Sequence, residues 1–248
     1  MDLGRVALQL YTVREYTSLG MIDTLSKLAD IGYTAFEFAG YGDSTPDKIR
    51  KALDDLGVSS MGAHVQLADI EAHPQRILED LNVLGCRYAI IPAIPPERRK
   101  DKDSVLRQAD KFNEWASWAK EASLSFGYHN HDFEFARFDG TSLWDILVER
   151  TEPSLVALEL DVFWAYEAGF DPAKVISDHA DRIELVHLKD KAPARPSLDA
   201  PVGDGVLPWS RILDACAAAE VQWYVVEQDY PQDALEEVRR SLRYLEQL

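Results

Sequence analysis

Imidazole, carboxylate and ammonium side chains recur where short apolar runs of this 248-residue sequence end. Several of them are two residues apart, such as His129 and His131 or His187 and Lys189. Side chains with this spacing on a strand point to the same face, so each pair can enter one site. The full set comprises Glu37, His64, His129, His131, Glu159, Asp161, His187, Lys189 and Glu227. Four of the six histidines of the chain belong to this set.

The mixture of imidazole and carboxylate donors predicts a divalent metal ion. Such groups repel one another or lose solvation in a partly dry cavity unless a cation or mutual pairing compensates. Nitrogen and oxygen donors without a nearby cysteine suit Mn²⁺, Mg²⁺, Co²⁺ or Zn²⁺ and disfavour a structural thiolate zinc site. We therefore expect one divalent metal, whose identity the residue types leave open.

Taken one at a time, several of these residues also have structural explanations. Glu37 or Glu159 could pair with a lysine or arginine inside the fold. His64 could be a structural or substrate-contacting histidine, and Lys189 could form a surface salt bridge with Asp190. The number of ionisable residues at strand ends favours a shared site over these separate explanations.

The elements that must position these residues alternate between strand and helix. A clear helix is expected over 46–56, with Thr45 as N-cap, Pro46 at the first helical position and Gly57 as the stop. A further amphipathic helix is expected over 104–123. Eight β-rich runs lie between such helices, at 6–11, 35–39, 60–65, 88–93, 125–131, 156–163, 183–189 and 223–228. This alternation predicts a parallel sheet, and eight units averaging 31 residues predict closure into a single (β/α)8 TIM barrel.

No Ser/Gly-rich linker divides the chain, so residues 1–248 are expected to form one domain. The longest irregular stretch, 191–208, is expected to be a functional loop. In a TIM barrel the βα loops and the C-terminal strand ends carry the chemistry. The polar set defined above lies at those ends.

The composition excludes some classes of partner. Twenty-six Lys plus Arg against 43 Asp plus Glu give a net charge of −17, which disfavours nucleic acid and anionic membranes. The N-terminal residues lack the pattern of a signal peptide, and the apolar runs are too short for a membrane span. Cys86 and Cys216 lie in apolar segments and are expected to be buried free thiols. A cytoplasmic protein is the resulting prediction.

The order and spacing of several motifs resemble those of the xylose-isomerase-like TIM barrels. That group contains sugar phosphate isomerases/epimerases, ketose 3-epimerases, inosose dehydratases and, more distantly, the endonuclease IV repair enzymes. The motifs are LQLYTVR at 8–14, GYTAFEFAG at 32–40, YHNHDFEF at 128–135, LELDVFWAYEAG at 158–169, VHLKD at 186–190 and VGDG at 202–205. The resemblance covers essentially the whole chain.

The resemblance implies a metal held by Asp161, His187, Glu227 and an acidic residue of the fifth strand. Many relatives have Glu-Asn-His in that strand, where this chain has an imidazole at position 129. Two accounts are open: His129 binds the metal, or Glu134 bends in to replace the missing carboxylate. This departure also argues against a simple two-glutamate epimerase mechanism.

The implied reaction is proton abstraction next to a sugar carbonyl, through an enediolate. Glu227 is the expected ligand and base, with His131 or His129 as a second acid/base. Glu37, His64, Glu159 and Lys189 are the expected substrate-binding residues.

The main prediction is a sugar isomerase or epimerase, and the alternative is a dehydratase or lyase of an inosose or 3-oxo-sugar. An endonuclease IV-like nuclease is a remote alternative, because this acidic chain lacks a basic DNA track. A non-catalytic sugar-binding barrel would not require the metal ligands. The expected partner is a small sugar or polyol, with a homo-oligomer left open.

Overall fold

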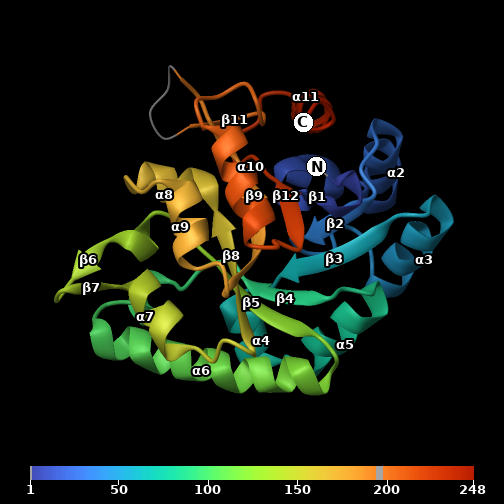
Figure 1. Ribbon diagram of the computed structural model, residues 1–248. Coiled ribbons are helices and arrows are strands. Elements are labelled where there is room, and N and C mark those ends of the chain that lie inside the picture. The colour runs from blue at the N-terminus through green and yellow to red at the C-terminus, as the bar shows by residue number, and fades with distance from the viewer. Residues whose placement is uncertain (1, 194–197) are drawn as a thin grey trace.

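Eight parallel strands close into a barrel with helices around its outside (Figure 1). The computed structural model describes residues 2–193 and 198–248. Sequential strands are neighbours, and β12 pairs with β1 to close the barrel. The strands are β1 (Val6–Gln9), β2 (Ala35–Phe38), β3 (Ser59–His64), β4 (Tyr88–Ile91), β5 (Ser125–His129), β8 (Val156–Asp161), β9 (Ile183–Leu188) and β12 (Trp223–Val226). Each predicted β-rich run contributes one barrel strand, so the predicted (β/α)8 TIM barrel is confirmed.

The helices follow the strands as crossover connections. They are α1 (Arg14–Thr17), α2 (Met21–Ile31), α3 (Pro46–Leu56), α4 (Leu67–Ala72), α5 (Pro74–Leu84), α6 (Lys102–Glu121), α7 (Leu143–Arg150), α8 (Val162–Glu167), α9 (Pro172–Asp178), α10 (Trp209–Ala218) and α11 (Ala234–Leu245). Among the described residues, no helix is long and apolar enough to cross a membrane.

The two helices predicted in detail are present. The α3 helix has the predicted bounds and ends at Gly57, which adopts the left-handed conformation at φ 67°. Thr45 takes the N-cap position in an extended conformation, but its hydroxyl accepts no hydrogen bond from the described helix. The α6 helix begins two residues earlier than predicted, because Asp101 caps it by accepting a hydrogen bond from the Ser104 N–H at 2.8 Å.

Two apolar regions hold the barrel together. The larger fills the space between the strands and the surrounding helices and includes the buried Leu28, Phe36 and Phe112. Both cysteines are free thiols and are buried, as predicted. The smaller region fills the barrel interior and consists of Ala7, Ala35, Met61, Tyr88, Ile90, Leu185 and Val225. The interior is therefore a packed core on which a polar layer can rest.

The predicted functional loop at 191–208 is tied to the end of β9 by Asp190. The carboxylate of Asp190 accepts hydrogen bonds from the Gly205 N–H at 3.0 Å and from Trp209 Nε1 at 2.6 Å. Two short antiparallel strands, β10 (Asp190–Lys191) and β11 (Asp199–Ala200), form the base of this loop. A second short pair, β6 (Arg137–Phe138) and β7 (Thr141–Ser142), lies after β5. Residues 194–197 of the predicted loop lie outside the described residues.

Candidate active site

The alternation of side chains along the strands places a polar layer directly above the apolar interior. Gln9, Glu37, His187 and Glu227 each come two residues after an apolar interior residue of the same strand. Strand register brings partners side by side: Gln9 pairs with Glu37, His129 with Glu159, and Asp161 with His187. Residues from six strands therefore converge at one end of the barrel.

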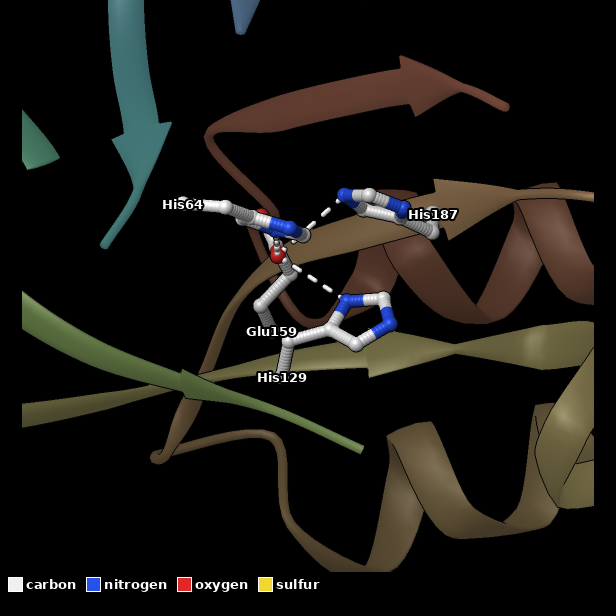
Figure 2. Close-up of side chains that lie close together, drawn as sticks. All are labelled: His64, His129, Glu159 and His187. Atoms are coloured by element: carbon white, nitrogen blue, oxygen red, sulfur yellow. Dashed lines mark hydrogen bonds and ion pairs between the residues drawn. The ribbon is translucent and has the colours of Figure 1, made fainter. Parts of the chain in front are cut away.

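Glu159 lies at the centre of three histidine rings, as Figure 2 shows. Its Oε2 lies 2.9 Å from His64 Nε2, 3.1 Å from His129 Nδ1 and 3.2 Å from His187 Nε2. Glu37 Oε2 lies 2.9 Å from His187 Nε2 and 3.3 Å from His64 Nε2. We call Glu37, His64 and Glu159 the inner cluster.

The two carboxylates of the inner cluster have pKa values shifted in opposite directions. Burial and the neighbouring Glu159 raise the pKa of Glu37 above its usual range. Burial by itself would also raise the pKa of Glu159, but the His187, His129 and His64 rings outweigh it and hold that pKa well below the usual range. The inner cluster therefore has one firmly ionised carboxylate, Glu159, at its centre.

Further acidic residues surround the ammonium of Lys189, above the inner cluster. Lys189 Nζ lies 3.0 Å from Asp161 Oδ2, 2.9 Å from Glu227 Oε2 and 2.9 Å from Asp229 Oδ2. Burial alone would lower the pKa of Lys189, but these three carboxylates hold it well above the usual range. We call Asp161, Lys189, Glu227 and Asp229 the outer cluster. A surface salt bridge between Lys189 and Asp190 is not formed, because Lys189 is buried and Asp190 faces the 191–208 loop.

His129 and His187 lie between the two clusters. His187 directs Nε2 toward Glu37 and Glu159, and its Nδ1 lies 2.9 Å from Glu227 Oε2. His129 directs Nδ1 toward Glu159, and its Nε2 lies 3.8 Å from Asp161 Oδ2. Each ring therefore offers one nitrogen to each cluster.

The arrangement fits a divalent metal ion. One ligand atom from each of His129, Asp161, His187 and Glu227 lies within 4.8 Å of the other three, and a second such group combines His64, His129, Glu159 and His187. Within the inner cluster, two buried carboxylate oxygens accept no hydrogen bond from the described residues: Glu37 Oε1 and Glu159 Oε1. Buried oxygens that accept no hydrogen bond cost free energy, so this donor set is suited to a cation.

Asp161 combines two tasks. Its Oδ1 caps α8 by accepting hydrogen bonds from the Phe163 N–H at 2.8 Å and the Trp164 N–H at 3.2 Å. The position of Oδ1 is thereby fixed, and Oδ2 is directed toward Lys189 and His129. Burial raises the pKa of this carboxyl to about 6, the first cause being lost solvation.

Of the predicted site residues, Glu134 is the one whose carboxylate contacts neither cluster and does not line the cavity above them. Its Oε1 accepts a hydrogen bond from the Tyr128 hydroxyl, and its Oε2 accepts one from the His131 N–H at 2.7 Å. It lies on a short 3-10 turn, Phe133–Phe135, beyond the end of β5. Burial raises its pKa to about 7. Between the two candidates for the fifth-strand ligand, the structure brings His129 to the other donors.

A cavity of about 550 Å³ opens above the outer cluster. Among the described residues that line it, Lys189 is the one lysine or arginine. Burial and the charge of Lys189 lower the pKa of His131 to about 4. The lining residues are Tyr11, Ala39, His64, Gln66, Pro92, Ala93, His129, His131, Trp164, Lys189, Glu227, Asp229 and Tyr230. The cavity therefore contacts both clusters: His64 of the inner cluster and Glu227 of the outer cluster line it.

Sequence reasoning missed two residues of the polar layer. Gln9 Nε2 donates a hydrogen bond to Glu37 Oε2 at 2.7 Å, and Asp229 is the third partner of Lys189. Asp229 follows Glu227 by two residues, so the alternation that linked His187 to Lys189 could have found it. Gln9 ends the first strand at the same level as Glu37, which only the pairing of β1 with β2 reveals.

Curated proteins with similar sequences include inosose dehydratases. The curated inosose dehydratase of Geobacillus kaustophilus (strain HTA426) is 28% identical over 190 residues, which cover 67% of this chain and 60% of the relative. A curated inosose dehydratase of Bacillus anthracis is 27% identical over 203 residues, covering 75% of this chain and 63% of the relative. The matched part of this chain therefore spans less than two thirds of the length of either relative.

Solved structures share the whole barrel. A sugar phosphate isomerase/epimerase from Parabacteroides distasonis ATCC 8503 superimposes with a TM-score of 0.84 at 25% identity, covering 98% of both chains. A structure described as IOLI protein with a binding zinc atom has a TM-score of 0.76 at 15% identity, a likeness of fold, and covers 97% of this chain and 96% of that one. The family model described as xylose isomerase-like TIM barrel matches residues 25–248. The chain therefore belongs to the xylose isomerase-like TIM barrel family.

Proposed function

We propose that the chain is a divalent-metal-dependent dehydratase of cyclic keto-polyols, of the inosose or 3-oxo-sugar class. The observation that carries this proposal is the convergence of His129, Asp161, His187 and Glu227 beneath a cavity of about 550 Å³. The similarity to curated inosose dehydratases supports the choice of reaction. A cavity of this size accommodates a small polyhydroxylated ring.

When bound by these four residues, the cation supplies Lewis-acid stabilisation of negative charge on substrate oxygens. The ring of His131 on the cavity wall takes the proton from the carbon next to the ketone. The electron pair of that C–H bond moves onto the carbonyl oxygen and gives an enediolate. When the carbonyl re-forms, the C–O bond on the next carbon breaks, and the hydroxyl leaves as water with a proton from His64. Solvent then restores both histidines.

The residue types on the cavity wall favour elimination over epimerisation. An epimerase needs bases on two faces of the carbon, commonly two carboxylates. The two carboxylates of this wall, Glu227 and Asp229, are both paired with Lys189, and the wall also presents the imidazoles of His64 and His131. Loss of water requires one base and one acid, and His131 can act as the base while His64 acts as the acid. Sugar isomerisation or epimerisation is the second candidate, because the 25% identical Parabacteroides structure carries that description. Both reactions share the enediolate.

The charge of the cavity favours an unphosphorylated substrate. Lys189 is the one lysine or arginine among the described lining residues, and three carboxylates already surround its ammonium. Glu227 and Asp229 add negative charge to the same wall. A phosphate group there would meet repulsion and find no available ammonium or guanidinium.

Turnover in deuterated water tests the reaction. The protein is stripped with a chelator, reloaded with Mn²⁺, Co²⁺, Mg²⁺ or Zn²⁺, and given a panel of inososes, ketoses and 3-oxo-glycosides. We expect activity only after reloading, and a product that has lost the mass of one water. Full activity in the stripped protein would remove the metal requirement. Deuterium at the α carbon without loss of water would replace dehydration by epimerisation.

A further inference from the structure

The rings of His129 and His187 each face carboxylates on both sides. On the inner side, His129 Nδ1 lies 3.1 Å and His187 Nε2 lies 3.2 Å from the same oxygen of Glu159 (Figure 2). On the outer side, His129 Nε2 faces Asp161 at 3.8 Å and His187 Nδ1 faces Glu227 at 2.9 Å. The two rings therefore separate the inner carboxylates from the outer ones.

Proton placement on these rings follows from the chemistry of their partners. An ionised carboxylate only accepts hydrogen bonds, so a ring nitrogen in contact with it carries the hydrogen. An imidazole with its hydrogen on one nitrogen presents a lone pair at the other. For His129, the inner contact at 3.1 Å is a hydrogen bond, whereas the outer separation of 3.8 Å is too long for one. These two distances assign the hydrogen of His129 to Nδ1 and the lone pair to Nε2.

We infer that Glu159 is a positioning residue that fixes the tautomer of His129 and, together with Glu37, the orientation of His187. Both rings then direct their outer nitrogens toward a metal ion, which displaces the hydrogen that His187 Nδ1 shares with Glu227 in the metal-free protein. This inference deepens the proposed function and rests on its metal site. The ion is then held by His129 Nε2, His187 Nδ1, Asp161 and Glu227. Carboxylates behind metal-bound histidines act in this way in proteins generally.

The surroundings of Glu159 favour a positioning role over a role as a metal ligand. Glu159 is fully buried and does not line the cavity, whereas Glu227 does. The Oε2 of Glu159 is also already surrounded by three imidazole nitrogens within 3.2 Å, which suits an acceptor of N–H groups.

Metal affinity tests this role. We would measure Mn²⁺ and Zn²⁺ binding by calorimetry for the wild type, Glu159→Gln, Glu159→Leu and Asp161→Asn. A residue that orients a ligand changes metal affinity by about 10–100-fold. We expect that loss for Glu159→Leu and a smaller one for Glu159→Gln, which retains one oxygen acceptor, with one ion per chain in both. Asp161→Asn removes a ligand charge and should lose binding altogether.

A matched control uses Glu184, near the N-terminal end of β9. Its carboxylate accepts a hydrogen bond from the Tyr88 hydroxyl at 2.9 Å, away from both clusters. Glu184→Leu and Glu184→Gln change the same residue type in a barrel strand, and we expect wild-type metal affinity for both. Equal losses in the Glu184 and Glu159 variants would show a general effect of barrel damage and would overturn the inference.

Two other outcomes would also overturn it. If the Glu159 variants bind metal as tightly as the wild type, Glu159 does not position the ligands. If Glu159→Leu loses the ion while Asp161→Asn keeps it, the ion is held by the inner group of His64, His129, Glu159 and His187. Two ions per wild-type chain would likewise make Glu159 a ligand and not a positioning residue.

Histidine NMR gives a readout that needs neither metal nor substrate. In metal-free protein with ¹⁵N-labelled histidine, we expect His129 to carry its hydrogen on Nδ1, with the signal assigned by its absence in His129→Gln. In Glu159→Leu that preference should be lost. A wild type that binds metal and shows this tautomer but acts on no keto-polyol would refute the proposed function alone. An Nε2–H tautomer in the wild type would refute this inference alone.

Discussion

The fifth-strand ligand can be identified by a pair of substitutions in one short segment, His129→Gln and Glu134→Gln. In the structure His129 belongs to both groups of converging donors, whereas both oxygens of Glu134 accept hydrogen bonds from Tyr128 and His131. We therefore expect His129→Gln to lose metal affinity and Glu134→Gln to keep it. Both side chains are buried, so each substitution also perturbs packing and serves as a control for the other.

The magnitude follows from the number of donors. Removal of His129 leaves three of the four converging ligand atoms, those of Asp161, His187 and Glu227. Residues that merely orient a ligand change affinity by up to about 100-fold, so loss of a ligand should exceed that value. For Glu134→Gln we expect a change of less than about 10-fold, the lower limit of the same range.

Calorimetric titration of the stripped variants with Zn²⁺ and Mn²⁺ measures both values, and circular dichroism verifies the fold. The reasoning is refuted if Glu134→Gln loses affinity by more than His129→Gln. That result would mean that Glu134 leaves its partners at Tyr128 and His131 when metal binds. If neither substitution lowers metal occupancy, both accounts of the fifth strand fail.

Three further predictions concern stability. Because burial raises the pKa of Glu134 from 4.5 to about 7, its ionisation opposes folding, and stability falls as pH rises through that window. The wild type should lose about 3 kcal/mol relative to Glu134→Gln between those pH values, measured by urea unfolding at each pH; a constant difference would contradict this. Lys189→Met should cost about 3–5 kcal/mol in metal-free protein, because the buried Asp161 and Glu227 and the half-buried Asp229 lose their cation. The exposed Lys174→Met, which breaks only the pair with Asp178, should cost less than about 1 kcal/mol; equal costs would refute the role of burial. Asp190→Ala should cost about 3 kcal/mol or more, since each buried donor left unpaired in the 203–209 loop costs about 1–3 kcal/mol; an unchanged urea midpoint would show that the loop is held by other contacts.

Much of the site follows from local sequence pattern. Eight β-rich runs alternate with helices, and a polar residue follows two positions after an apolar one in four strands, as at Leu185 and His187. The two-residue period of a strand is a local property, so it predicts which side chains share the interior face. The barrel and the gathering of imidazoles and carboxylates at one end could therefore be expected before any coordinates.

Which side chains each site residue contacts could not be predicted from the sequence, because these contacts join residues far apart in the chain. Glu134 stays with Tyr128 because a short 3-10 turn after β5 directs it there, and local alternation no longer applies beyond the strand end. Lys189 meets Asp229 across 40 residues, and His187 meets Glu37 across 150. These distances are set by strand register and by the closure of β12 on β1, which bring together residues that no local period connects.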